Sequence, residues 1–335
     1  MSPHISTRSS GKLAAGLFLM LTASIVFGAA WPAHAQPYPN KPIKLVVPFG
    51  PGGPTDVAAR LAARIIQEGL GQPVVIENRP GAGGATGTRS VAQSEPDGYT
   101  LLLGTVATLA AVPAVQKNAG FDPVKSFAAV SQLTDSATLM IVPTSLPVNT
   151  VGEFIAYAKA NKGKLNFASA GVGNQTHLNG EVFKAKTGLD LVHVPYKSGA
   201  EMLSAVLTEQ VQLTFSDISV ALALVESKKL KALAVTTPQR WPALPNLPTM
   251  IESGVPDFLS IFWTGVLAPA GTPPDVVNRL SAAIHAGLKS EASQAALARI
   301  GSVPRPRSPQ EFSDYIGSEA ARWSEAVKLA GIKPE

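Results

Sequence analysis

One local pattern recurs three times in this chain of 335 residues and limits its fold more than any other feature: a short apolar segment, a glycine-rich loop and the start of a helix. The apolar segments are residues 43–47, 73–77 and 165–168, and the loops that follow them are residues 49–54, 78–84 and 169–174. Strands that alternate with helices favour an α/β fold with parallel strands. We therefore predict three strand–loop–helix units, whose helices begin with Thr55 as a cap, at Ala85 and at about Gln175.

Two other apolar stretches stand apart from these units. They are residues 127–133 continuing into 139–142, and residues 261–267. Each could pass between two lobes, so both are candidate hinges. Farther along, Ser308-Pro309-Gln310-Glu311 has the form of a capping box, which predicts the start of a C-terminal helix.

The three glycine-rich loops could form an anion site. A loop at a helix N-terminus leaves backbone N–H groups unpaired beside the positive end of the helix dipole, so it attracts an anion without any Arg or Lys. Each loop alone could be only a tight turn. Together they favour a ligand site, because open α/β sheets bind ligands where strand ends meet helix N-termini.

Nucleotide-binding and catalytic motifs do not fit this sequence. The dinucleotide pattern needs a third glycine where the loops have Thr55, Thr86 and Thr176, and no G-x-x-x-x-G-K-[ST] motif occurs. No H-E-x-x-H or G-x-S-x-G motif occurs either. We therefore expect no cofactor and no metal.

Four polar residues remain as individual candidates. His177 could touch a ligand or pack locally, whereas His193 lies in an apolar run and is expected to be structural. Asp217 could accept a hydrogen bond from a ligand amine or hydroxyl, or it could cap a helix. Arg79 could pair with a carboxylate or face water.

The N-terminus has the three parts of a secretory signal peptide. Arg8 and Lys12 are basic, residues 13–30 are mostly apolar, and Ala33-His34-Ala35 precedes Gln36 as a cleavage site. A membrane span is the competing interpretation, but polar, proline-rich sequence follows at once. We predict cleavage after Ala35 and, for a bacterial chain, a periplasmic location. The absence of Cys excludes a lipid anchor on an N-terminal Cys, disulfides and thiolate metal sites.

Charge argues against a nucleic-acid partner. The full chain has 28 basic and 23 acidic residues. Removing residues 1–35 takes away Arg8 and Lys12 and no acid, which leaves 26 against 23 and a net charge of +3. Basic residues form no run that could follow phosphates.

Several motifs together resemble a known family. They are Val47-Pro48-Phe49 with Gly52-Gly53 and Asp56, residues 78–84 with Gly87, residues 96–102, residues 169–173 with His177-Leu178, residues 194–197, and Pro248-Thr249 with Glu252-Ser253-Gly254. In these runs the chain resembles the substrate-binding proteins of tripartite tricarboxylate transporters, the Bug receptors. The resemblance covers residues 38–332. It departs at Gly50-Pro51, where the family pattern often has Ala-Ala.

The resemblance implies an α/β, two-lobed periplasmic binding protein of type II, with two crossing strands and a mainly parallel sheet flanked by helices in each lobe. Lobe 1 would comprise residues 36–136 and 261–335, and lobe 2 residues 137–260. It further implies a monomeric receptor, not an enzyme, that closes over a small carboxylate and presents it to multi-span membrane transporter subunits.

The resemblance also implies which residues contact the ligand, mainly through main-chain donors and partly through bridging water. With Asp217 added from the reasoning above, the predicted site is Phe49, Gly53, Pro54, Thr55, Gly84, Ser169, Ala170, Gly171, Asn174 and Asp217. Two other functions stay open at this point. One is a ligand-sensing receptor for a signalling partner, and the other is a periplasmic hydrolase that uses Asp217 and His177.

Overall fold

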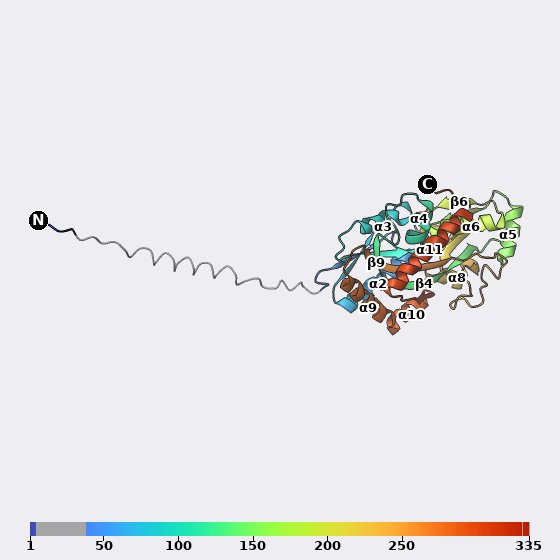
Figure 1. Ribbon diagram of the computed structural model, residues 1–335. Coiled ribbons are helices and arrows are strands. Elements are labelled where there is room, and N and C mark those ends of the chain that lie inside the picture. The colour runs from blue at the N-terminus through green and yellow to red at the C-terminus, as the bar shows by residue number, and fades with distance from the viewer. Residues whose placement is uncertain (5–37, 330, 335) are drawn as a thin grey trace. The chain divides into compact units, whose positions relative to one another are not determined.

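The computed structural model describes residues 1–4, 38–329 and 331–334 (Figure 1). The predicted cleavage site after Ala35 lies outside the described residues. The folded unit discussed below begins at Pro39. Among the described residues, no helix combines the length and the apolar character needed to cross a bilayer.

The described strands and helices alternate along most of the chain. The strands are β1 (Ile43–Val47), β2 (Val74–Asn78), β3 (Thr100–Thr105), β4 (Phe127–Pro143), β5 (Asn166–Ser169), β6 (Val192–Pro195), β7 (Leu213–Asp217), β8 (Leu230–Val235), β9 (Ile261–Pro269) and β10 (Ser302–Pro304). The α-helices are α2 (Pro54–Leu70), α3 (Ala85–Ala92), α4 (Val112–Val115), α5 (Val151–Ala160), α6 (Gln175–Thr187), α7 (Gly199–Leu207), α8 (Ile218–Glu226), α9 (Pro274–Leu288), α10 (Glu291–Arg299) and α11 (Pro309–Leu329). Two short turns of helix, η1 (Ala82–Gly84) and η2 (Ala107–Ala111), precede α3 and α4.

The strands form two sheets that share β4. In the first sheet β1 pairs in parallel with β2 and β3, and β9 joins β3 to β4 in antiparallel register. In the second sheet β5 pairs in parallel with β6 and β7, and β7 and β8 run antiparallel to β4. The predicted parallel units are therefore confirmed, and each lies beside an antiparallel strand.

The strand β4 changes partners part-way along its length. It pairs with β9 from Phe127 to Ala137, and with β7 and β8 from Thr138 to Pro143. The first candidate hinge is thus one continuous strand that enters both sheets. The second candidate, β9, pairs only within the first sheet. The chain returns from the second sheet to the first just before β9. At this point the Ser260 N–H donates to the Thr236 carbonyl at 2.9 Å.

Helix α11 packs against both halves of the molecule, with contacts to β4, η2 and α6 (Figure 1). Its predicted capping box is confirmed, because the Glu311 N–H donates to Ser308 Oγ at 3.3 Å and the Ser308 N–H donates to Glu311 Oε2 at 2.9 Å. From α11, Phe312 meets the buried Trp263 of β9 edge to face, with ring centroids 5.7 Å apart. This contact fixes α11 on the first sheet.

Candidate functional site

Four described helices begin at one small cavity between the two sheets. Helix α2 belongs to a unit of the first sheet, whereas α6, α7 and α8 belong to units of the second. The residues at or next to their first turns, including Gly53, Asn174, Ser198 and Asp217, line this space, which we call the inner cavity. It measures about 50 Å³, room for a few water molecules.

A wider space, the outer cleft, adjoins the inner cavity. It measures about 550 Å³ and is lined by the loops before α2, α3 and α6 and by the start of α7. Phe49, Gly50, Ala170 and Ser198 line both spaces. The outer cleft is therefore a continuation of the inner cavity.

The structure brings most of the predicted site residues together. Seven line the inner cavity: Phe49, Gly53, Pro54, Thr55, Ala170, Asn174 and Asp217. Gly84 and Gly171 line the outer cleft. Ser169 lines neither, and its fully buried side chain lies behind the third loop. The structure thus shows where these residues lie, whereas their contacts with a ligand stay predictions.

The first loop leads into α2 with open backbone donors. Gly53 is the N-cap and Pro54 occupies the first helical position, so the prediction of Thr55 as the cap is wrong. Proline favours this position because its fixed φ suits the first turn and its missing N–H would be unpaired there anyway. Gly53 has no side chain to cap the helix. The N–H groups of Thr55 and Asp56 therefore have no intrahelical partner.

The carboxylate of Asp56 holds this first loop in place. It accepts the Gly52 N–H at 3.2 Å and the Arg60 guanidinium at 3.0 Å. Asn78, at the end of β2, donates to the Phe49 carbonyl at 2.9 Å and to Asp56 Oδ1 at 3.4 Å. These contacts tie the first loop to α2 and to the end of β2.

Gly84 in the second loop acts through close packing. Its φ is +102°, and a Cβ added there would lie 2.6 Å from Thr108 Cγ2 and 2.9 Å from Phe49 Cζ. Its N–H donates to the Gly81 carbonyl at 2.9 Å. Gly84 therefore lets the Phe49 ring lie against η1, and its own N–H is engaged within its loop.

The third loop is held by its own side chains. Asn174 caps α6 by accepting the Thr176 N–H at 2.9 Å. The predicted donors are bonded internally, because the Ala170 N–H donates to Thr176 Oγ1 at 2.9 Å and the Gly171 N–H to Ser169 Oγ at 3.2 Å. Because Asn174 already engages the Thr176 N–H, the open donors of this segment are the first-turn N–H groups of Gln175 and His177, which the loop prediction did not include.

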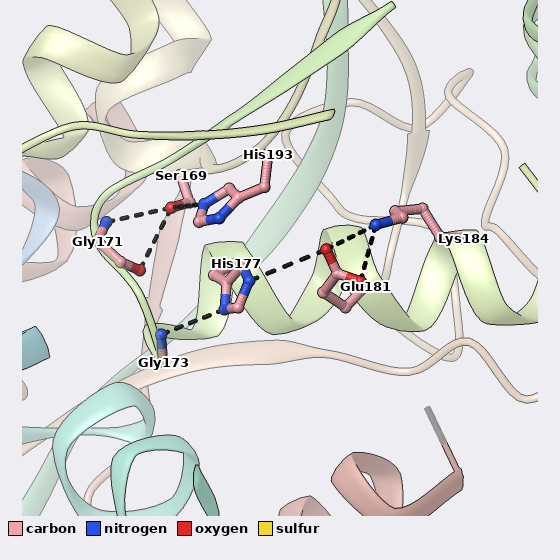
Figure 2. Close-up of polar contacts among 7 residues, drawn as sticks. All are labelled: Ser169, Gly171, Gly173, His177, Glu181, Lys184 and His193. Carbon is pink, nitrogen blue, oxygen red and sulfur yellow. Dashed lines mark hydrogen bonds and ion pairs between the residues drawn. The ribbon is translucent and has the colours of Figure 1, made fainter. Parts of the chain in front are cut away.

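Two stacked histidines support the third loop from behind (Figure 2). The rings of His177 and His193 lie 4.0 Å apart, and Phe167 stacks on His193 at 4.9 Å. His193 Nε2 lies 2.6 Å from Ser169 Oγ, and His177 Nδ1 accepts the Gly173 N–H at 3.2 Å. Burial and the neighbouring His177 lower the pKa of His193 to about 3, and burial also lowers the pKa of His177. Both rings are neutral at pH 7.

This arrangement separates His177 from Asp217. His177 faces the loop and His193 and does not line the inner cavity, whereas Asp217 does. The two residues proposed for a hydrolase therefore do not form a pair. His193 is structural, as predicted, and His177 packs locally.

The two carboxylate oxygens of Asp217 lie in different environments. It caps α8, because Oδ1 accepts the Ser219 N–H at 2.9 Å and also the Ser219 hydroxyl. Its Oδ2 is buried and has no partner at normal hydrogen-bond distance among the described residues, although the Ser136 hydroxyl, which pairs with Ser302 Oγ at 2.7 Å, lies close enough to favour the charged carboxylate. Burial raises the pKa of Asp217 to about 7. It carries the only ionisable side chain among the described residues of the inner cavity, where no Lys or Arg occurs.

Arg79 lies outside both spaces. Its guanidinium pairs with Glu77, and its side chain is 43% exposed. Lys44 contacts the same carboxylate at 3.0 Å. Of the two interpretations of Arg79, the surface one holds.

Sequence reasoning missed part of the cavity wall. Ser198 caps α7 by accepting the Glu201 N–H at 3.2 Å, and the spacing of these two residues is the signature of a capping box after a strand. That signal could have been found. Other lining residues, such as Thr138, Met202 and Phe262, come from distant segments and carry no local signal.

Two α/β sheets that share a long strand, with helix N-termini from both around one cavity, define the fold of the periplasmic binding proteins. Within that class, residues 58–332 match the family described as the tripartite tricarboxylate transporter family receptor. The chain belongs to this family, whose members are solute-binding receptors.

Relatives agree with this assignment over nearly the whole chain. The protein BugT of Bordetella pertussis is 36% identical, over 91% of this chain and 94% of its own length. The structure of R. palustris Rpa4515 with adipate is 38% identical, with a TM-score of 0.86 over 89% of this chain and 100% of that one. MatC from Rhodopseudomonas palustris with bound malate is 33% identical, with a TM-score of 0.83 over 87% of this chain and 100% of that one.

Proposed function

We propose that this protein is a periplasmic receptor that captures a small carboxylate in the inner cavity and presents it to a tripartite tricarboxylate transporter. The observation that carries the proposal is the convergence of the N-termini of α2, α6, α7 and α8 on a cavity whose described lining has no Lys or Arg. Helix N-termini with open N–H groups bind an anion by themselves. The adipate-bound and malate-bound relatives support a carboxylate as that anion.

We further propose the two predicted lobes as the moving parts. Lobe 1 is residues 36–136 with 261–335, and lobe 2 is residues 137–260. The change of β4 partners between Ala137 and Thr138, one residue past the proposed boundary, and the start of β9 at Ile261 support this division. A ligand that contacts both lobes binds the closed form more tightly, so it shifts the open–closed equilibrium.

The remaining parts of the proposal concern location and partners. We infer that export ends with cleavage after Ala35, and that the mature protein is a monomer that docks on multi-span transporter subunits without transforming its ligand. The mass of the exported protein tests the first point. A mass that corresponds to a chain beginning at another residue would refute the proposed cleavage site.

A thermal-shift screen over mono-, di- and tricarboxylates tests the receptor function. We expect at least one acid to raise the midpoint of thermal unfolding, because binding to the folded state alone stabilises it. Mass spectrometry of the recovered ligand should then show it unchanged. Chemical conversion of the ligand would show that the protein is an enzyme. The absence of a thermal shift with every acid would contradict the proposal of a carboxylate receptor.

A further inference from the structure

The unpartnered oxygen of Asp217 is an unusual feature of the inner cavity. Three buried side-chain atoms of the described residues have no hydrogen-bond partner, on Asn179, Asp217 and Trp323, and Asp217 alone of these residues lines this cavity. The residue as a whole is only 5% exposed. A buried acceptor without a partner destabilises the protein, so such a group in a binding cavity points to a donor supplied from outside.

Several neighbouring polar side chains are already engaged. Asn174 Oδ1 accepts the Thr176 N–H, Thr176 Oγ1 accepts the Ala170 N–H, and Ser198 Oγ accepts the Glu201 N–H. Gln175 Nε2 donates to Ser260 Oγ at 2.7 Å. The open helix N-termini are donors. Asp217 Oδ2 is therefore an acceptor in a cavity otherwise suited to an anion.

The lining of the inner cavity includes the apolar side chains of Met202, Val220 and Phe262, together with Thr138 and Ser216 next to Asp217. In such surroundings an unpaired charge or a repelling group on the ligand is costly, whereas a well-placed hydrogen bond is strong. A plain hydrocarbon segment beside Oδ2 would leave the oxygen without a partner. A hydroxyl, ammonium or amide hydrogen would satisfy it.

We propose, on the basis of the receptor function above, that Asp217 Oδ2 accepts a hydrogen bond from the solute, so that the preferred ligand is a carboxylate bearing a hydroxyl, amino or amide donor. The open helix N-termini bind the carboxylate of this ligand, and Asp217 selects the donor. Asp217 is thus a specificity residue, separate from the anion-binding loops.

The substitution Asp217→Asn isolates this role. Asn keeps an oxygen that can cap α8, since Asn is as good an N-cap as Asp, and it replaces Oδ2 by an NH₂ donor of nearly the same size. The matched control is Asp122→Asn. Asp122 likewise accepts backbone N–H groups, from Val124 and Lys125, and lies outside the cavity lining.

The probes are matched acids that differ only by the donor. Succinate, malate and aspartate form the four-carbon series, and glutarate and adipate with their 2-hydroxy and 2-amino derivatives form the five- and six-carbon series. Calorimetry at pH 8 gives the Kd of each acid for the wild type and both variants. This pH keeps Asp217 mainly ionised, because burial raises its pKa to about 7.

We expect the wild type to bind a hydroxy or amino acid at least about tenfold more tightly than the unsubstituted acid of its series, as is typical of a hydrogen bond to a charged group. Asp217→Asn should remove this preference, and Asp122→Asn should retain it. Equal binding of substituted and unsubstituted acids by the wild type would overturn the inference, as would an unchanged preference in Asp217→Asn.

Two further outcomes separate this inference from the receptor function. If no acid of the three series binds while another carboxylate of the wider screen does, the inference is wrong and the receptor proposal stands. If no carboxylate binds at all, both the inference and the receptor proposal are wrong. Should Asp217→Asn fail to fold by circular dichroism, Asp217→Ser retains a capping hydroxyl without the second oxygen, and the same loss of preference is expected of it.

Discussion

At the scale of single residues, the loop glycines differ in what a side chain would meet. Gly53 has a φ of −87°, and a Cβ built on it has no heavy atom within 4 Å. Gly171 has a φ of +125°, which strains any other residue. A substitution at Gly171 therefore tests backbone strain as well as binding, whereas one at Gly53 mainly tests the space that the ligand would fill.

We predict that Gly53→Val weakens carboxylate binding at least about tenfold, which corresponds to a loss of about 1.4 kcal/mol. The added methyl groups enter the space beside the open N–H groups of α2, and the backbone need not change. The unfolding midpoint without ligand should stay close to that of the wild type. Gly152→Val, at an exposed position in α5, is the control and should leave the Kd unchanged. Undiminished affinity in Gly53→Val would remove the first loop from the site.

The neutral histidines behind the third loop make stability depend on pH. The pKa of His193 is about 6.5 in the unfolded chain, and burial lowers it to about 3 in the folded protein. The stability that it contributes is therefore fully present above pH 6.5 and is lost as pH falls toward 3. Replacement of the ring by a neutral amide removes this titration.

We predict that His193→Gln lowers the unfolding midpoint at pH 7.5, because the stack on His177 and Phe167 is lost. Its midpoint should also fall less than that of the wild type between pH 7 and pH 4.5. Calorimetry at several pH values measures both effects. Parallel pH profiles for the two proteins would mean that folding does not lower the pKa of His193.

At the scale of elements, the local signals were reliable where the physical cause is local. Strand β1 has the predicted bounds, and α3 and α6 begin at the predicted residues. The start of α2 differs because Pro54 takes the first helical position and moves the cap to Gly53. The start of α7 was missed although Ser198 and Glu201 signal it.

The capping box of α11 offers a test at this scale. Ser308→Ala removes the acceptor for the Glu311 N–H, which should reduce the free energy of unfolding by about 1 kcal/mol. Chemical denaturation measures the loss. Because Ser308 lies outside the inner cavity, the Kd for a carboxylate should not change. A large change in Kd would instead connect the position of α11 with the cavity.

At the scale of the whole molecule, the small volume of the inner cavity limits how a ligand can enter. A space of about 50 Å³ holds a few waters, so a dicarboxylate would either extend into the adjoining outer cleft or need the walls to move apart. Separation of the two proposed lobes at β4 and at the Thr236–Ser260 contact would open the inner cavity. In this contact the Ser260 N–H donates to the Thr236 carbonyl at 2.9 Å, and the Thr236 hydroxyl donates to the Ser260 carbonyl at 2.5 Å.

We predict that a bound carboxylate reduces the radius of gyration of the protein, as measured by small-angle X-ray scattering with and without ligand. The reason is that only the closed form places donors of α2 and α6 on one ligand. Gly53→Val should show no decrease at the same ligand concentration. A radius that does not change on saturation of the wild type would show that binding needs no lobe closure.

Short-range rules were enough to predict the strand–loop–helix units and the family: apolar periodicity, the conformations open to Gly and Pro, and motifs that are contiguous in the chain. Tertiary packing alone decided which groups meet at the cavity. It gave the Ala170 N–H to Thr176, placed Ser169 behind the loop on His193, and left one oxygen of Asp217 without a partner. Hydrogen-bond partners depend on the positions of segments far apart in sequence, and no local pattern specifies those positions.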